Sequence, residues 1–313
     1  YACAIEKGTY NGSDTYLSGS KTYTSVLDEN DTITINDWNR KGWGYISYDR
    51  GFALSSNIAI ANILENFITK KDLAECFLKY GFGEITGMTL KNEAAGDVDF
   101  TYDVEAATAG YGQGITITPI QMIQALTMIS NDGVMLRPYI VSKIVKNGNI
   151  ELENKKEEIG KNLSIDTVKE LKKLLKSVIN SDSSIATGYN YYMEDYDLIG
   201  KTGTASIYDN KKGRYLDLEG EYVYSFAGMY PADNPDIIVY MVLERAKNNN
   251  EYMPNAIKNI ITNVSKYLNI TTSSESTSEY FALDYSNKIT TEIIRTHIRQ
   301  SRYLLKCHRL RVM

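Results

Sequence analysis

The chain has 313 residues, 43% of them hydrophobic and 23% charged, and a net charge of −5. This composition excludes a chain that is disordered throughout and is sufficient for one large domain or two modest ones. The acidic balance argues against nucleic-acid binding, and no run approaches the roughly 20 apolar residues that a membrane-spanning helix needs.

The cysteines and histidines restrict the chemistry further. The three cysteines form no C-x-x-C pair, and the only two histidines, His297 and His308, lie near the C-terminus. We therefore expect no metal site and no cofactor. A Ser-His-Asp triad is also excluded from the main body, so acyl-transfer chemistry there needs another base, for which lysine is the usual substitute.

The first half of the chain alternates irregular segments with helices. Residues 1–6 read as part of an apolar helix, so we expect further sequence before them, and a membrane anchor would belong to that sequence. Residues 9–50 are rich in Gly, Ser, Thr and Tyr and predict loops and short strands. Apolar spacing predicts three helices, over 56–70, 71–80 and 118–130.

The second half predicts a sheet covered by helices. Two strand-like runs joined at Asn147–Gly148 predict a β-hairpin over 137–152, and a helix follows over 164–179. Three further strands and a last helix are predicted over 196–208, 222–229, 236–244 and 255–268. Consecutive strands with helices before and after them indicate an antiparallel sheet in an α+β architecture.

A change of composition divides the chain into two parts. Residues 271–277 have the Ser/Thr-rich composition of a linker, and residues 288–313 carry seven Lys or Arg against one Glu. We expect one domain over 1–270 and a disordered linker and basic tail over 271–313. Alternatively, the tail is an arm that binds a surface, or an artefact such as a shifted reading frame.

The clearest chemical signal is the segment 200–205, which reads Gly-Lys-Thr-Gly-Thr-Ala within a predicted strand. On an edge strand, Lys201 offers positive charge to a substrate carboxylate and the threonine hydroxyls offer hydrogen bonds. Gly203 lets a ligand approach the backbone closely.

A second signal is Ser55-Ser56-Asn57, directly before the helix predicted over 56–70. Such a triplet is also what a helix N-cap looks like. The two interpretations are compatible, because a serine and an asparagine at a helix N-terminus are rigidly directed, as a proton relay and a substrate amide contact require.

The order of these segments resembles the transpeptidase domain of class B penicillin-binding proteins. The resemblance covers residues 1–268 and rests on six segments in order: 51–57 (GFALSSN), 81–83 (GFG), 93–96 (EAAG), 112–121 (GQGITITPIQ), 131–133 (NDG) and 200–205 (GKTGTA). It implies a five-stranded antiparallel sheet with helices on both faces. We interpret the glycines of 112–118 as a structural turn and not a phosphate cradle, because no strand is convincing before them.

The resemblance also implies roles for individual residues. Ser55 would relay a proton and Asn57 would hold the substrate amide, facing Lys201 across the groove. Lys201 would steer the substrate carboxylate, and Thr202 and Thr204 would hydrogen-bond it. The Thr204 backbone N–H would form half of the oxyanion hole.

Gly203 would keep the strand edge open for an extended peptide.

The family's nucleophile is the serine of an S-x-x-K motif at the start of a buried helix. The chain has one such motif, Ser18-Gly19-Ser20-Lys21, in a tract without helical periodicity. A serine and a lysine three residues apart share a face only on a helix. We therefore expect that Ser18 is not the nucleophile and that the catalytic serine belongs to sequence before Tyr1.

The function that the resemblance implies is cross-linking of peptidoglycan stem peptides through a serine acyl-enzyme that β-lactams also form. A serine β-lactamase or D,D-carboxypeptidase of the same fold, or a non-catalytic binding module, is the alternative. Expected partners are stem peptides, β-lactams and division or elongation proteins, but not nucleic acid. The expected location is the extracytoplasmic face of the bacterial membrane, held by an anchor outside this chain.

Overall fold

The computed structural model describes residues 1–25, 30–88, 92–179, 186–209, 211–216, 218, 220–270 and 272. Its elements in chain order are α1 (Ala2–Glu6), β1 (Thr15–Leu17), β2 (Ser20–Thr24), β3 (Thr32–Asn36), β4 (Tyr45–Ser47), α2 (Tyr48–Ala53), α3 (Asn57–Asn66), α4 (Lys70–Lys79), α5 (Asp103–Gly110), α6 (Pro119–Ser130), β5 (Val134–Leu136), β6 (Lys143–Lys146), β7 (Asn149–Glu153), β8 (Glu158–Lys161), α7 (Ile165–Ile179), η1 (Tyr189–Tyr191), β9 (Ile199–Ser206), β10 (Tyr208–Asp209), β11 (Arg214–Tyr215), β12 (Tyr222–Tyr230), β13 (Ile237–Glu244) and α8 (Asn249–Leu268).

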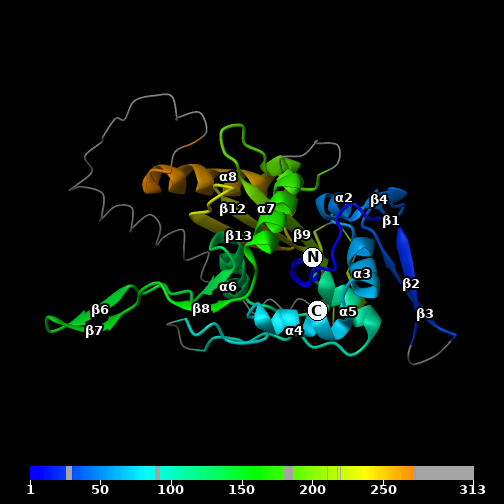
Figure 1. The fold of residues 1–313 in the computed structure, drawn as a ribbon, viewed down its shortest axis with the longest axis horizontal. Helices are drawn as coiled ribbons and strands as arrows, with labels where there is room; N and C mark the ends of the chain where they lie inside the picture. Colours follow the sequence, from blue (N-terminus) through cyan, green and yellow to red (C-terminus); the bar gives the residue numbers. More distant parts are fainter. Residues whose placement is uncertain are drawn as a thin grey trace.

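The centre of the molecule is an antiparallel sheet in the order β13-β12-β9 (Figure 1). Alternate residues of β9 and β12 point to opposite faces. On one face Ile199 and Met229 pack with Leu126 and Leu175 of α6 and α7. On the other face Phe226 packs against α8.

Helices therefore cover both faces, as predicted, and the α+β class is confirmed. Within the described residues this sheet has three strands, so the expected number of five is not reached. The three strands correspond to the three strand-like runs of the sequence, and β9 is an edge strand of this sheet.

Polar side chains explain where the helices begin. Thr118 accepts a hydrogen bond from the Gln121 backbone, and the Gln121 side chain accepts one from the Thr118 backbone, so the two form a capping box around Pro119. Fully buried Gln121 also donates to the carbonyls of Glu84 and Ala95, both at 2.6 Å. The Thr-Pro-x-Gln segment is thus a clamp that fixes the preceding loop to α6.

Two helices and one helix start differ from the prediction. α2 and α5 were not predicted, because α2 is only six residues long and α5 is built on alanines without an apolar stripe. α8 begins six residues early, at Asn249, and contains Pro254. The carbonyl of Asn250, which Pro254 cannot bond, accepts a hydrogen bond from Asn190 Nδ2 at 3.5 Å.

The hairpin β6–β7 projects from the body (Figure 1). Its two-residue turn is Asn147–Gly148, where both residues have positive φ, as a type I′ turn requires. The predicted hairpin is confirmed, although its strands span 143–153 and not 137–152.

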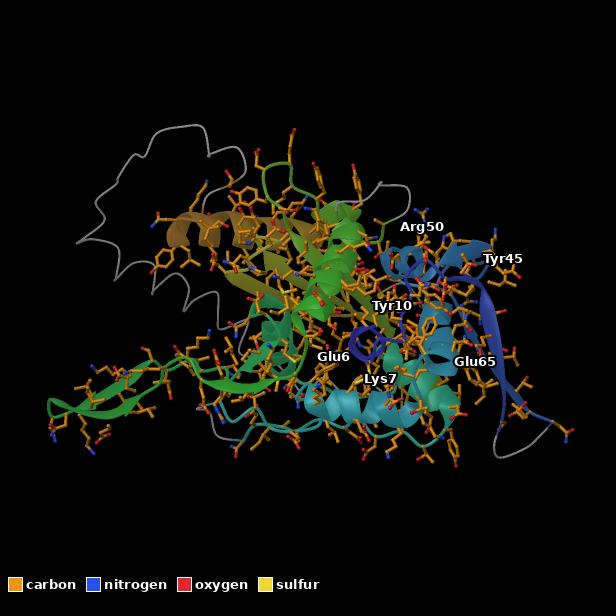
Figure 2. All side chains as sticks on the ribbon, in the orientation of Figure 1. Glu6, Lys7, Tyr10, Tyr45, Arg50 and Glu65 are labelled. Carbon is orange, nitrogen blue, oxygen red and sulfur yellow. A yellow bond between two sulfur atoms is a disulfide. The ribbon has the colours of Figure 1, made fainter. Side chains whose placement is uncertain are left out.

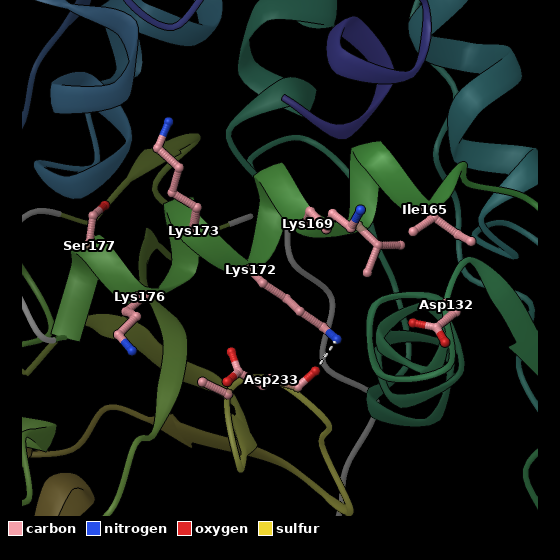
Figure 3. Close-up of a pocket in the computed structure, with 10 residues that line it drawn as sticks. Asp132, Ile165, Lys169, Lys172, Lys173, Lys176, Ser177 and Asp233 are labelled. Carbon is pink, nitrogen blue, oxygen red and sulfur yellow. Dashed lines mark hydrogen bonds between the residues drawn. The ribbon is translucent and has the colours of Figure 1, made fainter.

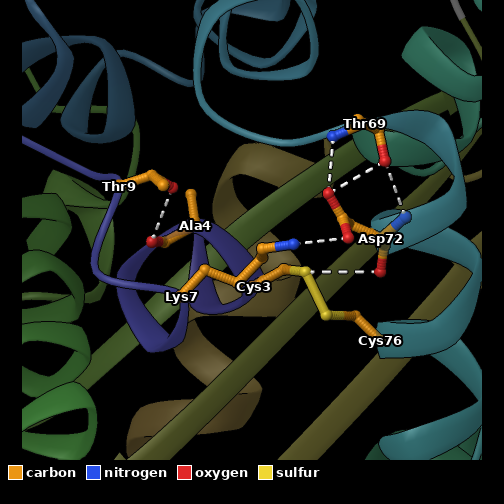
Figure 4. Close-up of a disulfide and its surroundings, with 7 residues drawn as sticks. All are labelled: Cys3, Ala4, Lys7, Thr9, Thr69, Asp72 and Cys76. Atoms are coloured by element: carbon orange, nitrogen blue, oxygen red, sulfur yellow. Dashed lines mark hydrogen bonds and ion pairs between the residues drawn. A yellow bond between two sulfur atoms is a disulfide. The ribbon is translucent and has the colours of Figure 1, made fainter.

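A disulfide joins α1 to α4 through Cys3 and Cys76, whose Cα atoms are 6.0 Å apart (Figure 4). Beside it, Lys7 forms an ion pair with Asp72. The sequence did not predict this pairing, because 73 residues separate the two cysteines and only the tertiary fold brings them together.

α1 is also fixed to α7, on its other side. Glu6, which lies next to Lys7 at the end of the helix (Figure 2), accepts hydrogen bonds from Ser164 N at 2.8 Å and Thr167 Oγ1 at 2.6 Å. A carboxylate at this position satisfies N–H groups at the start of α7 and complements the positive end of its dipole.

Among the described helices, none is long and apolar enough to cross a membrane.

Candidate active site

Ser55 occupies the junction between α2 and α3. Ser56 caps α3 by accepting a hydrogen bond from Ala59 N at 3.0 Å. Between the two helices Ser55 adopts a left-handed conformation with a φ of 54°. A residue other than glycine rarely adopts this conformation, and such strain is concentrated at functional sites.

Lys201 lies on β9, and its side chain reaches Ser55. The ammonium donates hydrogen bonds to the Ser55 hydroxyl and, at 3.0 Å, to the carbonyl of Thr202. The Phe52 ring lies with its centroid 6.0 Å from the ammonium. Burial of the ammonium lowers the pKa of Lys201 to about 8. The predicted proximity of Ser55 and Lys201 is confirmed.

Thr187 connects Ser55 to the next residue of the strand. Its hydroxyl is 3.2 Å from Ser55 Oγ and accepts a hydrogen bond from Thr202 Oγ1 at 2.9 Å. The Thr187 hydroxyl and backbone N–H both donate to the carbonyl of Ala53, at 3.4 and 3.2 Å. The sequence did not predict Thr187, because no motif marks it and its partners are 15 to 134 residues away.

The side chain of Asp37 holds the N-terminus of α3, and the sequence did not predict this contact either. Its side chain is 1% exposed and accepts hydrogen bonds from Ser56 Oγ at 2.8 Å, Ile58 N at 3.1 Å and Gly19 N at 2.8 Å. The carbonyl of the preceding residue, Asn36, accepts a hydrogen bond from Asn57 Nδ2 at 2.8 Å. The end of β3 therefore positions Ser56, Asn57 and Ile58 at the start of α3.

The remaining predicted residues lie on β9, in register with β12. Thr202 pairs with Phe226, Gly203 with Ser225 and Thr204 with Tyr224. A Cβ atom on Gly203 would lie 2.4 Å from Ser225 Oγ, so a side chain at this position would require the Ser225 hydroxyl to move. Thr204 is exposed, whereas the hydroxyl of Thr202 is directed at Thr187.

These residues share one cavity of about 1150 Å³. Ser55, Asn57 and residues 201–204 line it together with aromatic side chains that include Trp38, Tyr111 and Tyr224. Its lining also includes apolar side chains of α3 to α7, such as Ile60, Phe77 and Leu171. Of the described residues that line this cavity, Lys201 alone is charged.

A second hollow, of about 670 Å³, lies beside α7 and is lined by four lysines (Figure 3). Lys172 donates to the carbonyl of Asp233 at 2.7 Å. The other three lysines form ion pairs with nearby carboxylates: Lys169 with Asp166, Lys173 with Asp49 and Glu170, and Lys176 with Asp197. Because these acids balance the lysines, the hollow has no net positive charge to attract an anion.

The S-x-x-K motif does not form a catalytic pair. Ser18 lies just after β1, where it donates to the carbonyl of Gly44 at 2.8 Å and accepts from Trp43 N at 2.6 Å. Lys21 lies on β2 and binds Asn62 and Glu65 of α3. The prediction that Ser18 and Lys21 do not share a helix is confirmed.

The glycine-rich segment 112–118 follows helix α5 and not a strand, so it lacks the strand–loop–helix order of a phosphate-binding loop. Gly112 and Gly114 have φ values of 92° and 78°, and Thr116 pairs with Asp97. Across the described ranges, no cluster of His, Cys, Asp and Glu could hold a metal ion.

Comparison with known proteins agrees with this geometry. Residues 1–264 match the family model of the penicillin binding protein transpeptidase domain. Stage V sporulation protein D of Bacillus subtilis is 30% identical over 84% of this chain and 39% of its own length. The peptidoglycan D,D-transpeptidase FtsI homolog of Mesostigma viride is 26% identical over 76% of this chain and 40% of its own length.

Solved structures agree as well. Penicillin binding protein 2X from Streptococcus thermophilus superposes with a TM-score of 0.72 at 27% identity, over 91% of this chain and 42% of that one. The chain thus spans about two fifths of the length of these relatives.

Proposed function

Because this chain belongs to the penicillin-binding protein transpeptidase family, we propose that it forms the substrate groove of a peptidoglycan D,D-transpeptidase, the target of penicillin. One observation carries the proposal. Lys201, the only charge among the described residues of the main cavity, binds the hydroxyl of Ser55, so an anion anchor and a proton-carrying group meet at one point of the groove.

The substrate would be a stem peptide with a terminal D-alanyl-D-alanine. Its carboxylate would be attracted by Lys201 and hydrogen-bonded by Thr202 and Thr204. Asn57 would hold an amide of the peptide, which would lie along the open edge of β9 at Gly203 as an added strand. The Thr204 backbone N–H would donate to the developing oxyanion, a contact worth about 3 kcal/mol of barrier.

The acylated serine would come from a segment before Tyr1. Among the described residues, the one lysine that stands three positions after a serine is Lys21, and the Ser18–Lys21 pair lies outside the helices. Apolar side chains of α3 to α7 line the main cavity, which also includes Ala2 of α1, so the cavity would suit a buried helix. The serine oxygen would attack the penultimate carbonyl, and Ser55 would pass a proton to the departing terminal D-alanine. The amine of a second strand would then displace the serine, which regains its proton.

The cellular setting follows from the same family. We propose that the groove faces the extracytoplasmic side of the membrane, where peptidoglycan is built, and that the anchor lies outside this chain. Proteins of division, elongation or sporulation would be its partners; one relative is named Stage V sporulation protein D.

The proposal can be tested with the longer protein encoded together with the sequence upstream of Tyr1. We expect it to release D-alanine from a stem pentapeptide and, with an amine acceptor, to form a cross-linked product. Lys201→Ala should abolish both reactions, whereas Lys176→Ala, in the lysine-lined hollow, should leave them unchanged. Release of D-alanine into water with no cross-linked product would instead indicate a carboxypeptidase, and no release at all would refute the proposal.

A further inference from the structure

Thr187 lies between Ser55 and Thr202, to which the proposed function assigns roles, and it has no assigned role of its own. It follows α7 and precedes η1, and its hydroxyl lies within hydrogen-bonding distance of Ser55, Thr202 and the carbonyl of Ala53. A threonine hydroxyl has one proton to donate and two lone pairs that accept. The directions of these three hydrogen bonds can therefore be worked out.

The count of protons fixes the direction of the Ser55 hydroxyl. In the structure the Thr187 hydroxyl donates its single proton to the carbonyl of Ala53 at 3.4 Å. Thr202 donates its own proton to Thr187. Thr187 then has one lone pair left for Ser55, so Ser55 must donate at 3.2 Å. With its proton on this side, Ser55 presents a lone pair to the ammonium of Lys201.

We propose that Thr187 is a positioning residue that orients the Ser55 hydroxyl as an acceptor toward Lys201. This inference rests on the proposed function for its catalytic consequence, because a relay hydroxyl must be held in one orientation before it can exchange protons. Thr187 also accepts the proton of Thr202, which a substrate carboxylate would recruit on binding. Rotation of the Thr202 hydroxyl would be enough to turn its proton from Thr187 to that carboxylate.

Two variants separate positioning from a purely structural role. Thr187→Val keeps the shape and the backbone N–H bond to Ala53 at 3.2 Å, which anchors this loop, but removes the hydroxyl. Thr187→Ser keeps the hydroxyl. Loss of one oriented hydrogen bond of about 1.4 kcal/mol corresponds to about a tenfold change in rate.

In the longer protein, penicillin acylation separates non-covalent affinity from the first-order acylation rate. We expect Thr187→Val to lower the rate about tenfold with little change in affinity, and Thr187→Ser to restore it to within about threefold. A Thr187→Val rate equal to wild type, in a wild-type protein that acylates, would overturn the inference and leave the proposed function intact. Equal losses in both variants would indicate a structural role and also overturn it.

A second measurement tests the role of Thr187 without any reaction with penicillin. If the wild-type longer protein were not acylated by penicillin, that result would count against the proposed function but not against the role of Thr187. The ¹⁵N resonance of the Lys201 ammonium is followed with pH in the 313-residue chain. Without a fixed acceptor the charged form is less stable, so Thr187→Val should lower the pKa of Lys201 by about half a pH unit, whereas Thr187→Ser should not. Identical titrations in all three proteins would refute the inference.

Discussion

Replacement of Asp37 by asparagine should destabilise the domain, because Asp37 holds the N-terminus of α3 and the backbone of Gly19. The two hydrogen bonds to Oδ1, from Ser56 Oγ and Ile58 N, would persist to a neutral oxygen, while the NH₂ group would face the N–H of Gly19, which loses its acceptor. A hydrogen bond to a charged group contributes about 1.5–3 kcal/mol, and an unsatisfied buried donor costs about 1–3 kcal/mol. We therefore expect a loss of about 2–4 kcal/mol in the free energy of unfolding.

The assay is urea unfolding of the 313-residue chain, followed by circular dichroism, with Asp31→Asn as the matched control. Asp31 lies in the same part of the chain but is exposed, and its carboxylate accepts a hydrogen bond from the adjacent Thr32 N–H. Its replacement should change the free energy of unfolding by less than about 0.5 kcal/mol. If Asp37→Asn were as mild as the control, the buried carboxylate would not hold α3, and the account of how this end of the groove is positioned would fail.

Three further predictions concern the junction, the disulfide and the anion anchor. Because Ser55 has a φ of 54°, Ser55→Gly should be about 1 kcal/mol more stable to urea than Ser55→Ala, although both lose the hydroxyl; equal stabilities would show that the junction is unstrained. The Cys3–Cys76 disulfide joins residues 73 positions apart, and its reduction should lower the free energy of unfolding by about 4 kcal/mol. Reductant should not lower the free energy of unfolding of Cys76→Ser, which lacks the disulfide. An unchanged urea midpoint in the reduced wild-type protein would contradict this prediction. Because burial lowers the pKa of Lys201 to about 8, its positive charge is present below pH 8 and lost above it, so the affinity of the longer protein for penicillin should fall as the pH rises through 8. The affinity of Lys201→Arg for penicillin, and that of the wild-type protein for the penicillin methyl ester, should not fall in this pH range. A wild-type affinity that does not change with pH would exclude Lys201 as the carboxylate anchor.

Much of the site was predictable because each of its motifs is local. The strand-like run over 196–208 indicates a strand, and the Ser55–Asn57 triplet before an apolar helix indicates a cap, so each group could be placed on its element from neighbouring residues alone. The resemblance then supplied the one non-local step, the approach of Ser55 to Lys201 across 146 residues.

The supporting contacts could not be predicted, because they depend on tertiary proximity between residues without a pattern. Asp37 lies in a stretch that reads only as loops and strands, and nothing local distinguishes it from an exposed aspartate such as Asp31. Thr187 and the Cys3–Cys76 pair meet their partners only after folding. The role of Thr202 likewise depends on its neighbour, since its hydroxyl donates to Thr187.

The domain boundary at 270 stays a prediction. The family match ends at residue 264, and α8 ends at Leu268. Apart from Thr272, the predicted linker and basic tail over 271–313 lie outside the described residues.

Intact-mass analysis after incubation with penicillin tests the central claim most directly. Acylation requires a serine activated by a lysine one helical turn away, and the Ser18–Lys21 pair lies on strands and loops. The 313-residue chain and its Ser18→Ala variant should therefore gain no mass, whereas the longer protein with the sequence upstream of Tyr1 should gain the mass of one penicillin. An adduct on the 313-residue chain that disappears in Ser18→Ala would identify Ser18 as the nucleophile, and no adduct on the longer protein would contradict the proposed function itself.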